Sequence, residues 1–243
     1  MNPVYDTIGM NYSELRKPDP RIHARIATAL GSARTVLNVG AGAGSYEPAD
    51  RQVTALEPSR EMIRQRPAGA APVVQGRAED LPFDDDSFDA SMAVLTVHHW
   101  SDKAKGLREM RRVTRGPVVL LTYDPAFRGF WLADYIPELV DLDEAQMPRI
   151  TDYGDRLGPV EISPVPIPHD CSDGFLCAYW RRPAAYLDPR IRAAISSFWA
   201  LGDVSAALAR LARDLAGGDW ARLYPDLLDR DECDCGYRLV VTT

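Results

Sequence analysis

VLNVGAGAG, from Val36 to Gly44, is the stretch of sequence that decides the fold. It starts as a short apolar run that suits a β-strand, and it continues into three glycines, Gly40, Gly42 and Gly44. Glycines at the carboxyl end of a strand let the backbone turn sharply and approach a ligand without a clash from Cβ. The stretch predicts the first strand of an α/β sheet with a ligand at its end, although a GxGxG loop alone also fits an ordinary turn.

Strands and helices alternate around this stretch. A helix is predicted after Asp19, which can cap it, because Pro20 suits a first turn and Ile22, Ile26 and Leu30 share one face. Further strands are predicted at residues 53–56, 72–75, 88–97 and 118–123, with helices around Met62 and over residues 103–114. This alternation predicts an α/β fold with a doubly wound, mainly parallel, Rossmann-like sheet of seven strands.

The last third of the chain is less regular. Residues 160–167 predict a strand at the sheet edge, because their prolines exclude a central position. Helices are predicted over residues 189–201 and 204–215, and residues 237–241 predict the last strand. We therefore expect a helical cap inserted before the last strand. The predicted divisions are residues 1–33 as an N-terminal segment and helix gating the site, 34–167 as the sheet core, 168–235 as the cap and substrate region, and 236–243 as the last strand.

Composition narrows the possible partners. The 243 residues carry a formal net charge of −7, which makes nucleic acid a poor candidate for a substrate. No apolar run approaches the roughly 20 residues that span a bilayer, and residues 1–20 do not resemble a secretory signal. The four cysteines lack the CxxC spacing of a zinc site. We expect a cytoplasmic protein that is a monomer or a homodimer, with no metal and no membrane partner.

Two acidic features follow the glycines, each at the end of a predicted strand. Glu57 ends the second strand, where a carboxylate faces the same crevice and can accept hydrogen bonds from both ribose hydroxyls. The turn GRAEDLPFDDDSFD, residues 76–89, follows the third strand and can offer polar partners to an adenine edge. Seen alone, each feature also fits a solvated surface charge.

The order VLNVGAGAG, ALEPS, GRAEDLPFDDDSFD and AVLTVHHW resembles the class I S-adenosylmethionine-dependent methyltransferases, especially the ubiquinone/menaquinone and trans-aconitate methyltransferase type. The resemblance covers residues 34–123 and implies S-adenosyl-L-methionine as the cofactor. It also implies the cofactor-binding residues, which are Asn38, Gly40, Ala41, Gly42, Gly44, Glu57, Pro58, Ala78, Glu79 and Leu95. In similar methyltransferases an N-terminal segment folds across the cofactor, which makes Tyr5, Tyr12 and Arg16 candidates for that gate.

The sequence departs from the family pattern at two positions. Asn38 replaces the acidic residue usual before the glycines, and Arg77 stands where aspartate is common. A nicotinamide dehydrogenase is the competing Rossmann-type interpretation, but it requires GxGxxG and a helix whose N-terminus receives the pyrophosphate. Here the third glycine comes one position early, and Pro48 disfavours a long helix after the loop.

Catalytic and substrate-binding candidates lie outside the glycine loop. His98 and His99 follow the fourth strand, and either can act as a base or stabilise the turn. His169 and Asp170 lie at the predicted mouth of the cap, where they can contact substrate, remove a proton as catalytic groups, or stabilise a loop. The aromatic candidates for the substrate pocket are Trp100, Trp131, Phe175 and Tyr179.

We therefore expect an enzyme that transfers a methyl group to an O, N or C atom of a small molecule, plausibly in specialised metabolism. The alternative is a methyltransferase-like protein that binds the cofactor but catalyses another reaction, such as a cyclisation, or only binds.

Overall fold

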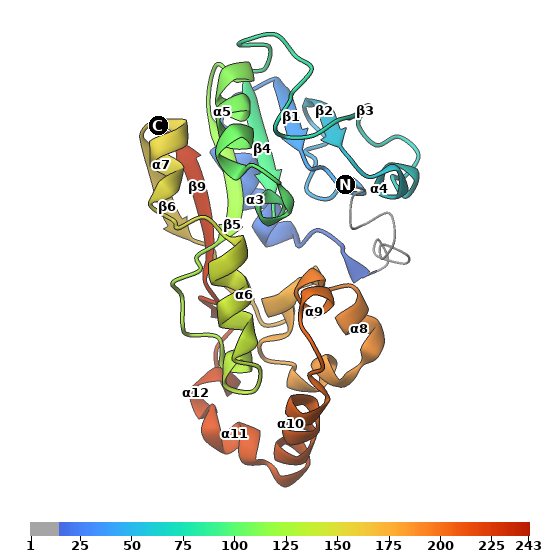
Figure 1. The fold of residues 1–243 in the computed structure, drawn as a ribbon, viewed down its shortest axis with the longest axis vertical. Helices are drawn as coiled ribbons and strands as arrows, with labels where there is room; N and C mark the ends of the chain where they lie inside the picture. The colour runs from blue at the N-terminus through green and yellow to red at the C-terminus, as the bar shows by residue number, and fades with distance from the viewer. Residues whose placement is uncertain (1–14) are drawn as a thin grey trace.

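The computed structural model describes residues 15–243, and a seven-stranded sheet lies at its centre, in the order β3-β2-β1-β4-β5-β9-β6 (Figure 1). These strands are β1 (Thr35–Val39), β2 (Gln52–Glu57), β3 (Val73–Gln75), β4 (Ala90–Val94), β5 (Val118–Tyr123), β6 (Val160–Pro164) and β9 (Tyr237–Thr242). β1 to β5 are parallel, and β9 runs antiparallel between β5 and β6. The mainly parallel sheet predicted from the sequence is confirmed, with the proline-rich β6 at its edge.

Helices cover both faces of the sheet. This is required because successive side chains of β1 point to opposite faces, and apolar residues lie on both faces. Val36 packs with Ile22 and Ile26 of α3 on one face, whereas Leu37 and Val39 pack on the other face with α5 and α7. The helices that flank the sheet are α3 (Pro20–Ala29), α4 (Arg60–Arg64), α5 (Lys103–Val113) and α7 (Asp152–Leu157). The predicted cap of α3 is also present, because Asp19 accepts a hydrogen bond of 3.0 Å from the Arg21 backbone N–H.

β4 is shorter than the strand predicted over residues 88–97. It ends at Val94, because Leu95 adopts a φ of 52° and turns the chain into a short 3₁₀ helix, η1 (Val97–His99). A leucine with positive φ is uncommon, and such backbone strain concentrates at functional sites. The turn lies at the carboxyl end of the sheet, beside the glycine bend.

A helical lobe lies beyond the carboxyl edge of the sheet (Figure 1). It contains η2 (Trp131–Asp134), α6 (Glu138–Gln146), η3 (Leu176–Tyr179), η4 (Pro183–Leu187), α8 (Pro189–Ala193), α9 (Ser196–Ala200), α10 (Ser205–Gly217), α11 (Asp219–Leu223) and α12 (Pro225–Leu228), with a small ribbon of β7 (Ile167–Pro168) and β8 (Glu232–Cys233). The helix predicted over residues 189–201 is two short helices, because Ile195 between them is extended and buried.

The segment between β5 and β6 also contributes to this lobe, although the sequence placed it in the sheet core. Trp131 packs against Trp220 with ring centroids 5.3 Å apart, and Tyr135 donates a hydrogen bond of 2.7 Å to Asp214. Such contacts between segments far apart in sequence leave no periodic signal. Across residues 15–243, no helix is both long enough and apolar enough to cross a membrane.

Candidate functional site

The glycine bend lies where β1 and β2 end side by side. Val39 is in register with Leu56, and the Leu56 carbonyl accepts hydrogen bonds from the N–H groups of Gly40 and Ala41, at 2.8 and 3.0 Å. Gly40 has a φ of 69°, and a Cβ there would lie 2.2 Å from Thr96 Oγ1. The bend therefore requires glycine both for its backbone conformation and for its close approach to the turn after β4.

Glu57 lies directly beside this bend. Its side chain is buried, with Oε2 accepting a 2.8 Å hydrogen bond from the Gly42 N–H and Oε1 accepting one of 2.8 Å from the Ser59 N–H. A carboxylate can accept several hydrogen bonds, including those from the two hydroxyls of a ribose. A Cβ on Gly42 would enter open space. A buried carboxylate beside an open glycine bend fits a ribose, so the residues present fit an adenosine cofactor.

An ion pair holds the far side of the glycine loop. Asn38, at the position usual for an acidic residue, donates a 3.2 Å hydrogen bond to Glu47, and Glu47 pairs with Arg66 at 2.8 Å. Both residues of the pair are partly buried, and Arg66 also donates to the Gly42 carbonyl at 3.4 Å. Glu47 therefore supplies the acidic group that Asn38 lacks. Residues 41–51 form turns instead of a helix, so the helix N-terminus that a pyrophosphate requires is absent from this stretch.

The predicted adenine residues lie near α5. Ala78 is buried and packs close to Gly106 and Trp100, and Glu79 accepts hydrogen bonds from the Ser101 N–H and hydroxyl, at 2.6 and 2.8 Å. Burial opposes ionisation of Glu79, but these hydrogen bonds outweigh it, and the net effect lowers its pKa. Trp100 belongs to the core beneath α5 instead of a substrate pocket.

His98 and His99 lie on η1, not on an extended strand, so their rings do not point to opposite sides. The ring centroids are 3.8 Å apart. Burial, followed by the positive charges of Arg16 and Lys103, lowers the pKa of His99 to about 4, and burial with the same charges and His99 lowers the pKa of His98 well below its usual value. Both imidazoles are therefore uncharged at neutral pH and are weak bases.

A cleft starts at His98 and runs between the sheet edge and the helical lobe. Leu95 and His98 line its sheet side, together with Tyr123 at the end of β5. Asp143 of α6 and Phe175 of the loop before η3 line its lobe side. The cleft thus joins the predicted methionine end of the cofactor site to the helical lobe.

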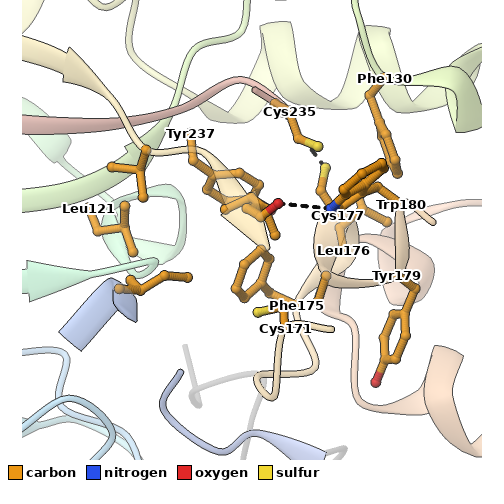
Figure 2. Packing of buried hydrophobic residues seen from close by; sticks show 14 of the residues in the cluster. Leu121, Phe130, Cys171, Phe175, Leu176, Cys177, Tyr179, Trp180, Cys235 and Tyr237 are labelled. Atoms are coloured by element: carbon orange, nitrogen blue, oxygen red, sulfur yellow. Dashed lines mark hydrogen bonds between the residues drawn. The ribbon is translucent and has the colours of Figure 1, made fainter. Parts of the chain in front are cut away.

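Only some of the predicted substrate residues reach this cleft. Phe175 does, whereas Trp131 and Tyr179 pack inside an aromatic cluster of the lobe around Tyr186, with ring-centroid distances of 5.6 and 5.9 Å. Figure 2 shows the Tyr179 ring pointing away from Phe175. A pocket role for Trp131 or Tyr179 would require them to leave this buried packing.

His169 and Asp170 lie on a different surface. Asp170 is exposed and pairs with Arg21 at 2.7 Å, and a ring nitrogen of His169 lies 3.1 Å from the Asp231 carbonyl. Neither lines the cleft. Their contacts fit the loop-stabilising role that the sequence left open.

Arg16 connects the N-terminal segment to both parts of the site. It lines the cleft, and its Nε donates a 2.6 Å hydrogen bond to the buried Asp173, which also accepts one of 2.9 Å from Tyr46 of the glycine loop. The Tyr46 hydroxyl accepts in turn from the Asp19 N–H at 3.3 Å. The other two residues predicted for the gate, Tyr5 and Tyr12, lie outside the described residues.

The sequence did not single out Tyr123, Asp143 or Tyr237, which also line the cleft. The position of Tyr123 at the carboxyl end of a parallel strand could have indicated it. Asp143 offers no such signal, because its helix alternates charged and apolar residues. Within residues 15–243, no group of three or more His, Cys, Asp or Glu side chains is arranged to hold a metal ion.

Known proteins support the same assignment. Residues 37–121 match a family model described as "Methyltransferase domain". Among curated proteins, a methyltransferase of Bacillus subtilis named YcgJ, itself uncharacterized, is 32% identical over 120 residues, which are 45% of this chain and 44% of that protein. The UbiE ubiquinone/menaquinone biosynthesis C-methyltransferase of Geobacter is 29% identical over 134 residues, covering 45% of this chain and 57% of that protein. The matched segments thus span less than two thirds of the length of each of these relatives.

A solved structure from Anabaena variabilis extends the match to the whole fold. That protein, assigned as a methyltransferase of an antibiotic biosynthesis pathway, is 36% identical, and the match covers 94% of this chain and 99% of that one with a TM-score of 0.86. The likeness therefore includes the helical lobe as well as the sheet. The chain belongs to the class I S-adenosylmethionine-dependent methyltransferase family.

Proposed function

We propose that the protein transfers a methyl group from S-adenosyl-L-methionine to a small molecule bound in the cleft. The observation that carries the proposal is the 2.8 Å hydrogen bond between Glu57 and the Gly42 N–H, which brings a buried carboxylate and an open glycine bend to one place. The cleft that begins beside Leu95 supports an acceptor site next to it. The relatives named above support the reaction type.

The cofactor supplies an already activated methyl group on a sulfonium. The protein's task is therefore to align the acceptor and to exclude water, and alignment contributes about 7–11 kcal/mol in favourable cases. We propose that Glu57 binds the ribose, with Pro58 beside it, and that Gly40, Ala41, Gly42 and Gly44 follow the ribose and methionine part. Asn38, Ala78, Glu79, Leu95 and Arg16 complete the proposed cofactor site.

His98 and His99 remain the proposed polar groups at the methionine end. His98 lines the cleft, and its lowered pKa keeps its imidazole neutral. A neutral imidazole can accept a hydrogen bond from an acceptor hydroxyl, but its low basicity makes it a poor final holder of the proton. A group with a higher pKa than these histidines would hold a proton from the acceptor better.

A small molecule is the acceptor class that the site supports. The cleft is lined by residues of both the sheet edge and the lobe, so a small molecule bound there would contact both. The net charge of −7 disfavours a polyanionic acceptor such as nucleic acid. No feature of the described residues favours a cyclisation or a purely binding role over methyl transfer.

The test is calorimetric binding of S-adenosylhomocysteine to the wild-type protein and to Glu57→Ala. Glu57→Ala should weaken binding by about 1.5–3 kcal/mol, the worth of hydrogen bonds to a charged group. Because the substitution also removes acceptors from two backbone N–H groups, Glu57→Gln serves as the milder variant, with folding checked by thermal unfolding. Glu161→Ala, at an exposed carboxylate on the edge strand, is the matched control.

Two results would contradict the proposal. Unchanged affinity in a folded Glu57 variant would exclude the ribose role. Tight binding of S-adenosylhomocysteine without transfer of labelled methyl to any component of a metabolite extract or a broad substrate panel would support the alternative function, in which the cofactor is bound but no methyl is transferred.

A further inference from the structure

α6 carries a carboxylate on the face that it turns toward the cleft. Asp143 lines the cleft together with Gln146 and Met147, three and four residues later, whereas Asp141 and Glu144 of the same helix are exposed. Positions three and four residues apart share one face of a helix. Of the described residues that line the cleft, Asp143 is the one with a carboxyl group.

Arg128, whose charge acts on Asp143, and Arg16, which lines the same cleft, are both bound to other carboxylates. Arg128 pairs with Glu144, the exposed neighbour of Asp143, and Arg16 pairs with Asp173. Within residues 15–243, no hydrogen bond or ion pair reaches the Asp143 carboxylate. A half-buried carboxylate without a partner is costly, so proteins tend to keep one where it has a function.

The groups around Asp143 do not offset this cost. Burial raises the pKa of Asp143 to about 7, and the attraction of Arg128 only partly opposes the rise. The other ionisable groups of the cleft are Tyr123 from β5, Tyr237 from β9, His98 from η1 and Arg16 from the N-terminal segment. Burial also raises the pKa of both tyrosines, which keeps their phenols protonated, and His98 is neutral.

Aromatic rings form one wall of the cleft. The Phe175 and Tyr237 ring centroids are 4.8 Å apart, and those of Tyr123 and Tyr237 are 5.4 Å apart. Figure 2 shows Phe175 and Tyr237 adjacent to each other, with Phe175 entering from the loop and Tyr237 from β9. Aromatic side chains that line a cleft can pack against a planar ligand.

We propose, building on the methyl transfer proposed above, that Asp143 receives the proton of a hydroxyl group on a planar aromatic acceptor. The acceptor oxygen forms its bond to the methyl carbon with its own electron pair, and the carbon–sulfur bond breaks with its pair left on sulfur. The hydroxyl proton moves to a carboxylate oxygen of Asp143 and later leaves to solvent. The step consumes one positive and one negative charge, which a poorly solvated cleft favours.

A hydroxyl fits better than an ammonium. An ammonium nitrogen has no free electron pair with which to form the new bond to carbon, and a bound sulfonium would repel its positive charge. A carboxyl group whose pKa lies near neutrality is also better matched to receive a proton at physiological pH than the two weakly basic histidines.

The first experiment measures binding of two pairs of probes in the presence of S-adenosylhomocysteine, by ligand-observed NMR titration. The pairs are phenol with its methyl ether anisole, and catechol with its dimethyl ether veratrole. Wild-type protein should bind each hydroxyl probe about 10- to 100-fold more tightly than its ether, the ratio expected for a hydrogen bond to a charged group. Asp143→Ala should lose this preference, and Asp141→Asn, on the exposed face of the same helix, should keep it.

The second experiment measures thermal unfolding against pH and needs no ligand. Because the pKa of Asp143 is higher in the folded state than in the unfolded chain, its contribution to stability is complete at low pH and is lost as pH rises toward and through about 7. Asp143→Asn should therefore gain melting temperature relative to wild type as pH rises from about 4 to 8. Asp141→Asn should follow the wild-type profile.

The outcomes separate this inference from the function that it builds on. No saturable binding of the hydroxyl probes to the wild-type protein, equal preference in wild type and Asp143→Ala, or an unchanged pH profile in Asp143→Asn would each overturn the role of Asp143. Failure of the wild-type protein to bind S-adenosylhomocysteine would instead overturn the proposed methyl transfer. If Asp143→Ala does not fold, the preference is measured with Asp143→Asn, whose amide cannot take the proton and should bind the hydroxyl probes less tightly.

Discussion

The cofactor edge of the sheet and the cleft beneath the helical lobe each contain a carboxylate shielded from solvent, but the two carboxylates differ in their hydrogen-bond partners. At the edge, both oxygens of Glu57 accept backbone hydrogen bonds, from Gly42 and Ser59. In the cleft, Asp143 has no such partner within the described residues, although Arg128 lies close enough to affect its pKa. The first carboxylate is held in place before any ligand arrives, and the second is left available.

This difference indicates how one fold can separate cofactor binding, which all family members share, from acceptor chemistry, which differs between them. A rigid edge whose carboxylate is fixed by backbone hydrogen bonds suits a ligand that is the same in every member of a family. A carboxylate without a hydrogen-bond partner among the described residues, in a cleft built from distant segments, suits chemistry that differs between members. Perturbing each region in turn can test whether the two tasks are separable.

The largest effect is expected at the bend. Gly40→Ala would place a methyl group 2.2 Å from Thr96 Oγ1 at a φ of 69°, so it should destabilise the fold by about 2–5 kcal/mol and weaken binding of S-adenosylhomocysteine. Gly31→Ala is the matched control, because Gly31 has a φ of 59° with no atom near the new methyl group. The control should cost about 1–2 kcal/mol and leave binding unchanged. Stability is measured by chemical denaturation and binding by calorimetry. If Gly40→Ala and Gly31→Ala had equal effects in both measurements, the contact with Thr96 would be unimportant.

An intermediate effect is expected where the two regions are joined. Tyr46→Phe removes the hydrogen bonds to Asp173 and from the Asp19 N–H, so it should cost about 1–3 kcal/mol and weaken cofactor binding. Tyr135→Phe removes a similar bond to Asp214 within the lobe and should leave cofactor binding intact. If both variants bind S-adenosylhomocysteine like the wild type, the junction does not couple the lobe to the glycine loop.

The smallest effect is expected from the histidines between the regions. Because the pKa of His98 is lowered in the folded protein, its contribution to stability is complete above the unfolded value near 6.5 and is lost as pH falls below it. We compare the melting temperature of His98→Asn with that of the wild type at pH 5 and at pH 8. The variant's advantage over the wild type should be about 2–4 °C larger at pH 5 than at pH 8. His169→Asn, outside the cleft, is the comparison variant, and scanning calorimetry at both pH values provides the measurement. An identical pH dependence in wild type and His98→Asn would mean that protonating His98 costs no stability.

Sequence reasoning predicted how the glycine bend and Glu57 come together far better than it predicted which residues line the cleft. Gly40, Gly42 and Glu57 lie at the ends of consecutive strands, and parallel strands bring such ends together whatever the rest of the chain does. The strand predicted through Val97 was too long, because nothing local reveals the turn at Leu95. Trp131 and Tyr179 were expected at a pocket, yet they pack into the lobe, since an aromatic residue suits either environment.

The sequence by itself determined the order of elements, the doubly wound sheet and the family, because each depends on local periodicity and on short motifs with fixed spacing. Only the tertiary structure decided which residues line the cleft between the cofactor edge and the helical lobe. It placed Asp143 of α6 in one cleft with Tyr237 of the last strand, and it moved His169 and Asp170 to another surface. The physical reason is that a side chain's role in a cleft depends on which distant segments pack around it, and no local pattern records that packing.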